Sequence, residues 1–357
     1  MKEEHTTILK LKIGNTQKTN IIEKGISTLL IEPQFILGVK KYFREIRFDL
    51  VLYSTPPITF AKVIEYVKKR DHAKSYLLLK DIFPQNAVDI GMMTTKGPKS
   101  LIYNFFRKKE EKLYQLSDFI GCMSQANLDY LLEHNPQINP AKVHINPNSF
   151  EIISSNRNIK NKQELYRKYA IPMRATTFVY GGNLGKHQNI PFIIECLKAN
   201  KNMSDRFFVI CGTGTEFGRL KQFIDIEKPQ NVLLLNGLPR AEYEDFIKAF
   251  DVGLIFLDHR FTIPNFPSRI LSYMQARMPV LACTDPNTDI GQVIEAGEFG
   301  WWCESNDVAA FTKAISKIII SDINSYGNRA YDYLCNNYSS KQSYQTIQQC
   351  ILRGEQG

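Results

Sequence analysis

Short apolar runs alternate with longer stretches of helical period along most of this chain. In the first half, the runs at 48–53, 75–80 and 119–123 predict strands, the segments 59–70, 98–116 and 125–133 predict helices, and a short run follows at 142–146. Continuous apolar strands that alternate with helices are typical of a parallel sheet covered by helices on both faces.

The alternation is clearer in the second half. Strands are predicted at 176–180, 207–211, 232–235, 252–257, 280–283 and 301–303, and helices at 191–198, 241–250, 268–276, 290–296 and 308–320. The expected fold class is therefore α/β, with two doubly wound Rossmann-like domains facing a ligand cleft, because such sheets bind ligands beyond the carboxyl ends of their strands.

A polar stretch at 154–162 interrupts the alternation and indicates a linker at 154–175. The linker separates an N-terminal domain at 1–153 from a C-terminal domain at 176–335, and 336–357 is expected to form a helix that packs back toward the N-terminal domain. At the start, 6–13 and 26–31 predict a strand and a connecting element, without the strand, Gly-rich turn and helix that normally open such a domain. The N-terminal domain is thus expected to lack its opening unit.

Composition narrows the possible functions. No apolar run approaches the roughly 20 residues that a membrane-spanning helix needs. Of the net charge of +9, +7 lies in the first 150 residues, which hold 22 basic and 15 acidic side chains. A basic half favours nucleic acid, an anionic membrane surface or a phosphorylated substrate, or it is only a well-solvated surface. Seven widely spaced cysteines fit no disulfide framework, and a charged start without an apolar signal segment favours the cytoplasm.

The strongest local motif is Tyr-Gly-Gly-Asn-Leu-Gly-Lys at 180–186, directly after the strand that opens the second domain. Gly181, Gly182 and Gly185 allow a tight turn and a close approach of backbone to ligand, and Lys186 adds a positive charge there. The spacing matches neither a Walker A loop nor G-x-G-x-x-G, so a plain turn is the alternative to a phosphate site.

Two further segments point to the same edge of the sheet. Gly212 and Gly214 follow the next strand, and Ser268 and Arg269 begin a later helix. A hydroxyl, a helix N-terminus and a guanidinium are the parts of a diphosphate clamp. The alternative is that Ser268 caps the helix and Arg269 lies on its solvated face.

Taken together, GGNLGK, CGTG, NGLPR, AFDVGL and PSRILSYMQARMPVLA resemble the sugar-nucleotide domain of the family 4 retaining glycosyltransferases, which have the GT-B architecture. Through YSTPP at 53–57 and KDIFPQ at 80–85 the resemblance extends from Leu9 to Tyr338. Within the family the chain looks most like bacterial N-acetyl-L-fucosaminyl transferases of O-antigen and capsule assembly.

The resemblance implies that Lys186 and Arg269 bind the two phosphates of a UDP-sugar and stabilise the departing diphosphate. It places the turn at 212–214 against the nucleotide and Leu238 and Pro239 against the base. Many members carry two glutamates eight positions apart, where this chain has Pro264 and Ser272. Ser272 therefore replaces the glutamate that usually holds the ribose, and sugar recognition at 261–266 must differ.

In the first half, Lys80 and Asp81 follow a predicted strand, where related enzymes place a charged residue near the reacting carbon. Asp81 is placed to accept a hydrogen bond from donor or acceptor, and Lys80 to neutralise phosphate. The alternative for Asp81 is a cap on the segment that follows. No protein nucleophile is assigned. The histidines and carboxylates lack metal spacing, so no metal and no cofactor is expected, with the UDP-sugar as a co-substrate.

The segment 100–113 combines apolar residues with Arg107, Lys108 and Lys112. A core helix with a solvated face explains this pattern, and docking on an anionic inner leaflet is the functional alternative.

The favoured function is a retaining glycosyltransferase that moves an amino-deoxy sugar, N-acetyl-L-fucosamine, from UDP to a polyprenyl-diphosphate-linked saccharide. Its expected location is the inner face of the cytoplasmic membrane, as a peripheral protein that binds no nucleic acid. Two alternatives remain at this point: a UDP-sugar epimerase of the same architecture, and a truncated inactive or non-catalytic partner that binds UDP-sugar.

Overall fold

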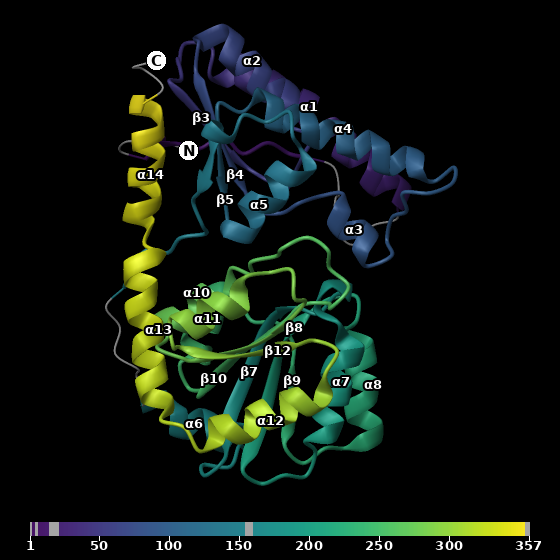
Figure 1. Ribbon diagram of the computed structural model, residues 1–357, viewed down its shortest axis with the longest axis vertical. Coiled ribbons are helices and arrows are strands. Elements are labelled where there is room, and N and C mark those ends of the chain that lie inside the picture. The colour runs from purple at the N-terminus through teal and green to yellow at the C-terminus, as the bar shows by residue number, and fades with distance from the viewer. Residues whose placement is uncertain (1, 4–5, 14–20, 154–159, 354–357) are drawn as a thin grey trace. The chain divides into compact units, whose positions relative to one another are not determined.

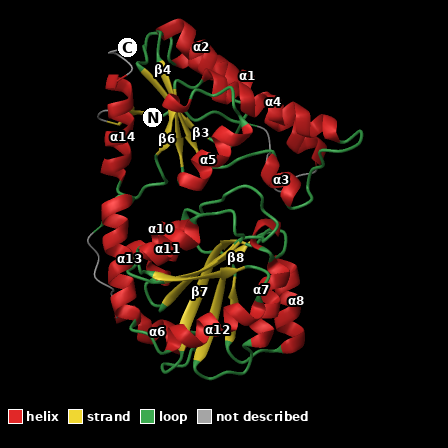
Figure 2. Ribbon diagram, viewed as in Figure 1, coloured by secondary structure: helices red, strands yellow, loops and turns green. Residues whose placement is uncertain are grey.

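The computed structural model describes residues 2–3, 6–13, 21–153 and 160–353 (Figure 1). The chain divides into two compact units. The first unit comprises residues 1–146 together with 346–357, and the second comprises 147–345. Each unit is built around its own parallel sheet (Figure 2).

The sheet of the first unit has four parallel strands in chain order. They are β3 (Leu50–Ser54), β4 (Lys74–Leu79), β5 (Phe119–Cys122) and β6 (Val143–Ile145). The connecting helices are α2 (Ala61–Asp71), α3 (Gln85–Asp89), α4 (Ser100–Leu116) and α5 (Gln125–His134), followed by the 3-10 turn η1 (Pro140–Lys142). The four strands and the helices α2, α4 and α5 lie within two residues of the bounds that the apolar pattern predicts, whereas α3 and η1 were not predicted.

One face of this sheet packs against α2, α4 and α5. Leu77 is opposite Tyr53 on one side and Ile120 on the other, so these three side chains share a face. Leu77 and Ile120 belong to a cluster with residues of α4 and α5, and Tyr53 packs against both this cluster and the one that holds residues of α2 and α4. On the opposite face, residues from the C-terminal helix α14 (Ser340–Arg353) reach β6.

The beginning of the chain differs from the expectation. The residues described there form a two-stranded ribbon, β1 (Lys2–Glu3) paired with β2 (Thr6–Thr7), and the segment 26–31 lies within the long helix α1 (Ile21–Tyr42). The reason is tertiary: Phe35 packs 5.0 Å from Phe60 of α2, and Leu11 fits against Gly38, where a Cβ would come within 2.7 Å of it. α1 is therefore an outer helical layer on α2.

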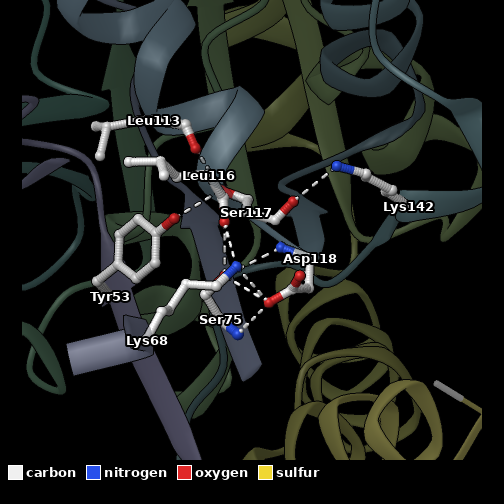
Figure 3. A network of polar contacts seen from close by, with 8 residues as sticks. All are labelled: Tyr53, Lys68, Ser75, Leu113, Leu116, Ser117, Asp118 and Lys142. Carbon is white, nitrogen blue, oxygen red and sulfur yellow. Dashed lines mark hydrogen bonds and ion pairs between the residues drawn. The ribbon is translucent and has the colours of Figure 1, made fainter. Parts of the chain in front are cut away.

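A network of polar contacts joins the amino ends of β4 and β5 (Figure 3). Lys68 of α2 donates to Asp118 (2.7 Å), to Ser75 Oγ (2.9 Å) and to the Leu116 carbonyl (2.7 Å), and the Ser75 N–H also donates to Asp118 (2.7 Å). Burial acts to raise the pKa of Asp118, but the hydrogen bonds from Lys68 and Ser75 hold it below its usual range. The network fixes the end of the sheet opposite to Lys80 and Asp81.

The second unit has a six-stranded parallel sheet in the order β12-β11-β10-β7-β8-β9. Its strands are β7 (Thr176–Asn183), β8 (Arg206–Thr213), β9 (Val232–Leu235), β10 (Val252–Phe256), β11 (Val280–Thr284) and β12 (Gly300–Glu304). Its helices are α6 (Lys160–Lys168), α7 (Ile190–Ala199), α8 (Phe217–Glu227), α9 (Arg240–Ile247), α10 (Arg269–Gln275), α11 (Ile290–Ala296), α12 (Val308–Ile319) and α13 (Ile323–Asn337).

The strand order places a topological switch point between β7 and β10. From β7 the chain moves outward through β8 to β9, then returns to β10 and continues through β11 to β12. In open parallel sheets, the loops that follow the two strands at such a point separate and leave room for a ligand. The motif at 180–186 and Arg269 both follow strands of this pair.

Residues 160–168 of the expected linker form α6, and its Tyr166 is buried. The Tyr166 hydroxyl lies 2.8 Å from Thr177 Oγ1 and 3.0 Å from the Ala249 carbonyl. α6 is thus packed against the second unit. None of the described helices is long and apolar enough to cross a membrane.

Candidate functional site

The Gly-rich motif at 180–186 continues a strand. β7 extends through Asn183, and its end pairs in register with β8, Gly182 opposite Gly212. The sequence places the turn directly after Tyr180, and this is wrong by three residues. The pairing continues because glycines, which lack a Cβ, let the backbones of β7 and β8 approach closely. A Cβ on Gly212 would lie 2.0 Å from the Gly182 carbonyl oxygen.

The loop after β7 lies equally close to the loop after β8. A Cβ on Gly214 would lie 2.2 Å from the carbonyl oxygen of Leu184, and the Gly185 N–H donates to the side chain of Gln188 at 3.1 Å. Lys186 begins the 3-10 turn η2 (Lys186–Gln188), and its side chain is exposed. The structure therefore brings the two predicted glycine turns together and puts Lys186 at their rim.

Arg269 reaches the same loop from α10. Its guanidinium lies 4.4 Å from the centre of the Tyr180 ring, and a Cβ on Gly182 would come within 2.7 Å of Arg269 Nη2. Gly182 has φ of 131°, a value that suits glycine. Arg269 is thus held against the glycine strand, and the alternative that it lies on a solvated helix face is wrong. Ser268 is exposed and makes no side-chain capping bond, so the capping alternative fails too.

The two cations lack an acidic counterpart. Among the described residues, no carboxylate forms an ion pair with Lys186 or with Arg269, although most other half-buried basic groups of this unit have one, such as Lys162 with Asp251 at 3.0 Å. A cation that loses water without gaining a counterion costs free energy, which a bound anion recovers. The loop at β7 is therefore the candidate anion site of this unit.

Two tyrosines complete the surroundings of this loop, and the sequence analysis missed both. The Tyr273 hydroxyl accepts the Gly181 N–H at 3.3 Å and lies 3.1 Å from the Leu254 carbonyl, which ties β7 to β10. Tyr243 of α9 fills the space beside Gly181, where a Cβ would fall 1.9 Å from its hydroxyl. Burial raises the pKa of Tyr273 to about 12 and that of Tyr243 further, so both stay neutral. The one signal in the sequence for these tyrosines was Gly181, because a glycine within a strand can mark a place where another side chain packs directly against the backbone.

The remaining predicted residues of the second unit border this site. The loop after β9 lies beside the turn at 212–214, since a Cβ on Gly237 would be 3.3 Å from the Thr213 side chain. Leu238 is half-buried and Pro239 exposed in that loop. Ser272 is half-buried on α10, one residue before Tyr273. The structure thus gathers the nucleotide-binding candidates of this unit at one edge of its sheet.

Lys80 and Asp81 belong to the first unit, where they follow β4 at the carboxyl edge of its sheet. Lys80 is exposed. The Asp81 backbone N–H donates to Thr55 Oγ1 at 3.2 Å, and its carboxylate accepts a hydrogen bond from the Asn86 amide at 2.8 Å. Burial raises the pKa of Asp81 to about 6 although the bond from Asn86 acts to lower it. The residue that precedes α3 is Pro84, so Asp81 is not its N-cap, but the Asp81 carboxylate does bond the Asn86 side chain in the first turn of α3.

The carboxylate of Asp81 thus lies at the edge of the sheet where ligands bind in this architecture. Within the described parts of the chain, no group of three or more His, Cys, Asp and Glu side chains is placed to hold a metal ion.

Comparison with known proteins identifies the class. Residues 161–332 match the model of the family described as glycosyl transferases group 1. The chain is 25% identical over 346 residues to the probable glycosyltransferase WbjE of Pseudomonas aeruginosa, which covers 95% of this chain and 83% of that protein. The expectation that the chain is a glycosyltransferase is confirmed.

Solved structures confirm the fold. HepE of Anabaena, crystallised in complex with UDP-glucose, has a TM-score of 0.67 at 15% identity, with 88% of this chain and 82% of HepE covered. Sucrose-phosphate synthase of Thermosynechococcus elongatus has a TM-score of 0.73 at 12% identity, with 97% of this chain and 82% of that chain covered. The expected α/β class, two Rossmann-like domains of the GT-B type, is confirmed.

Proposed function

We propose that this protein transfers an amino-deoxy sugar, N-acetyl-L-fucosamine, from UDP to a lipid-linked saccharide with retention of configuration, in the assembly of O-antigen or capsule. One observation carries the proposal: Lys186 and Arg269 present two positive charges, without acidic partners, beside bare backbone at the β7–β10 switch point. A nucleoside diphosphate matches this site in charge.

The chemistry follows from where charge develops. When the bond between the sugar and the diphosphate breaks, negative charge grows on the leaving oxygens, and fixed cations stabilise that state more than the ground state. Arg269 is held by the Tyr180 ring before the ligand arrives, while Lys186 is exposed and free to adjust. The two cations perform the task that a metal ion has in other transferases, so we propose a reaction without a metal.

In the first unit, Asp81 is proposed to accept a hydrogen bond from a hydroxyl or amide of a substrate, and Lys80 to contact phosphate. The carboxylate is held by Asn86, and its raised pKa suits a group that exchanges a proton near neutral pH. We assign no nucleophile.

The comparisons support the donor class and bear less on the sugar. HepE binds UDP-glucose and UDP in its crystal structures, and the glycosyl transferases group 1 match covers the unit with the anion site. Ser272 and Pro264 stand where the resemblance leads one to expect glutamates, which is compatible with a deoxy sugar that has fewer hydroxyls. The lipid-linked acceptor implies attachment to the cytoplasmic membrane, and the basic first half of the chain supports it.

The test is UDP release from a panel of UDP-sugars, with a bacterial membrane extract as the source of acceptor. We expect turnover with UDP-N-acetyl-L-fucosamine above that with UDP-glucose, and a product whose anomeric configuration, determined by NMR, is the same as that of the donor. UDP binding without turnover for any donor would overturn the proposed transfer. Turnover with another UDP-sugar would keep the donor class and overturn the sugar.

A further inference from the structure

Strand β12 forms one edge of the six-stranded sheet, because β11 is its only neighbour among the described strands. The Phe299 carbonyl accepts a hydrogen bond from the Val280 N–H at 3.3 Å, and the Ser305 N–H donates to the Thr284 carbonyl at 2.9 Å. The odd-numbered residues of 299–305 therefore direct their backbone groups toward β11. Since this direction alternates along a strand, the even-numbered residues direct theirs away from the sheet.

The outward backbone groups of this strand are largely open. The Glu304 carbonyl accepts the Asp307 N–H at 3.3 Å, but no described residue makes a hydrogen bond with the backbone N–H or C=O of Gly300 or Trp302. A groove of about 480 Å³ is lined by 300–303 of the strand. Unpaired backbone groups at a sheet edge are a template for the addition of another strand.

Two helices border this edge from opposite faces of the sheet. Trp301 packs in the cluster that holds Phe311 of α12, whereas a Cβ on Gly291 of α11 would come within 2.7 Å of the Trp302 ring. Successive side chains of a strand point to opposite faces. α12 therefore covers one face beside the open edge and α11 covers the other.

The two sides of the groove carry opposite charge. Lys313 and Lys317 of α12 line it and are exposed, and among the described residues no carboxylate pairs with either. Glu295 of α11 and Glu298, just after this helix, are exposed on the other side. Glu298 has a basic neighbour, Arg329, whose Nε lies 4.0 Å from its Oε2. The groove is thus basic on the side of α12 and acidic on the side of α11.

The groove has room for a backbone and a fixed strand to pair with. Ala310 and Ala314 line it on the side of α12, so that helix presents only small side chains next to the strand. The Trp301 ring stacks on Tyr326 of α13, with 4.4 Å between the ring centres. This stack holds β12 in place before a partner arrives.

We infer that β12 accepts an extended segment of a partner protein as a further strand, with acidic side chains on the α12 side and basic side chains on the α11 side. Charge complementarity sets this pattern, because alternate side chains of an added strand enter the two sides of the groove. The inference does not depend on the proposed transfer reaction, since β11 separates β12 from the β7–β10 switch point.

A second copy of this chain suits the edge less well. Two β12 strands paired antiparallel would be related by a two-fold axis perpendicular to the sheet, so each face would meet its own copy. Lys313 and Lys317 would then approach the same lysines of the other copy, and Glu295 the same glutamate. Like charges placed opposite each other destabilise strand pairing.

The fluorescence of tryptophan provides the test. The chain has two tryptophans, Trp301 and Trp302, and both lie on β12. The probe is the blocked hexapeptide Glu-Lys-Val-Thr-Glu-Lys, whose glutamates share one face and whose lysines share the other when it is extended. We expect a saturable change in fluorescence that weakens at high salt. The hexapeptide Glu-Val-Lys-Lys-Thr-Glu, of the same composition but with mixed charge on each face, should bind about tenfold more weakly.

Methylation of the probe's amide nitrogens separates backbone pairing from charge attraction. In an added strand, one alternate set of N–H groups faces β12 and the other set faces away. Methylation of one set should abolish binding, and methylation of the other should change the affinity by no more than about threefold. Equal effects of the two sets would overturn strand addition.

A charge reversal tests the assignment of the sides. Lys313→Glu with Lys317→Glu makes both sides acidic, so this variant should bind the probe about tenfold more weakly and should gain binding of Lys-Lys-Val-Thr-Lys-Lys. The matched control is Lys221→Glu with Lys228→Glu, at exposed positions on and just after α8, which packs against β9 at the opposite edge. It changes the net charge equally and should leave probe binding unchanged. UDP binding confirms that each variant is folded.

Two results would overturn the inference. No change in fluorescence up to about 1 mM probe would show that the lysines only protect the edge from pairing. A dimer in solution that the probe dissociates would assign the edge to a second copy. UDP binding and turnover, measured without peptide, report separately on the proposed function.

Discussion

The guanidinium of Arg269 lies 4.4 Å from the centre of the Tyr180 ring, and Tyr180 directly precedes the paired glycines of β7. A cation over an aromatic face is attracted by the ring quadrupole, which offsets part of the cost of removing it from water. The stack also fixes the guanidinium against Gly182, so its position does not depend on a ligand. Transition-state stabilisation is most effective when the charge is placed in advance, and this pair provides that.

Replacing Arg269 tests this placement. Arg269→Lys keeps the charge but loses the planar fork and the stack on Tyr180, so we expect kcat/KM for the UDP-sugar to fall about 100-fold. Lys186→Ala should have a similar effect on activity. Arg174→Lys, at an exposed position before β7, serves as the control. Wild-type kinetics in both site variants would contradict the diphosphate clamp.

Replacing Gly212 with alanine should distort the proposed UDP-binding site. Its Cβ would lie 2.0 Å from the Gly182 carbonyl oxygen, so Gly212→Ala must part the ends of β7 and β8. We expect loss of UDP binding by calorimetry and destabilisation of about 2 kcal/mol or more. Gly218→Ala in α8 is the control, because its Cβ meets nothing within 4 Å. There, alanine should raise stability by roughly 0.5–1 kcal/mol.

Replacing Asp81 with asparagine should raise the stability of the protein at neutral pH and lower its activity. Its pKa rises from 3.8 to about 6 on folding because of burial. Because the pKa is higher in the folded state, protonation of Asp81 stabilises the folded protein. This stabilisation is fully present below about pH 4 and is lost as pH rises through 6. Above pH 6 the folded protein bears a cost of at most about 3 kcal/mol. Asp81→Asn should therefore be more stable than wild type at pH 7.5 and equal to it at pH 4, by urea unfolding.

The same substitution should abolish turnover, and wild-type activity should fall as the pH drops below 6. Asp89→Asn, at the end of α3, is the comparison for a carboxylate of the same segment. A variant that gains no stability at pH 7.5 would show that burial does not strain Asp81. Full activity in Asp81→Asn would remove it from the reaction.

The network at the amino ends of β4 and β5 is a structural element, and its disruption should affect folding only. Lys68→Met leaves Asp118 and Ser75 without their shared donor, and we expect a loss of about 2–3 kcal/mol. Lys69→Met removes an exposed pair one position along α2 and should cause no measurable change. Combining Lys68→Met with Asp118→Asn should cost less than the sum of the two, by urea unfolding. Strict additivity would argue against coupling.

Metal removal is a further test. If Lys186 and Arg269 alone neutralise the diphosphate, turnover should be unchanged within about twofold after treatment with EDTA and removal of the chelator. Restoration of activity by added magnesium or manganese after such treatment would show that a cation takes part.

Much of the fold was predictable because parallel strands are apolar along their whole length and the helices between them are not. The bounds of β9 and α11 match the predicted ranges residue for residue, and the other predicted elements lie within a few residues. The segment 26–31 was misassigned because its apolar residues serve contacts between helices, and a short apolar run does not distinguish a helix from a strand. The helices α3, α8 and α13 were not among the predicted elements.

For the site, the sequence by itself determined which residues are candidates for the chemistry. Glycines, Lys186 and Arg269 at strand and helix ends indicate anion binding from residue type and spacing alone, and Asp81 follows from its place after β4. Only the tertiary structure decided that Arg269 rests on Tyr180, that Tyr243 and Tyr273 enclose the glycine strand, and that burial shifts the pKa of Asp81. Spacing along the chain reports local geometry, whereas burial and the presence of a counterion depend on residues that are distant in sequence and meet only in the folded protein.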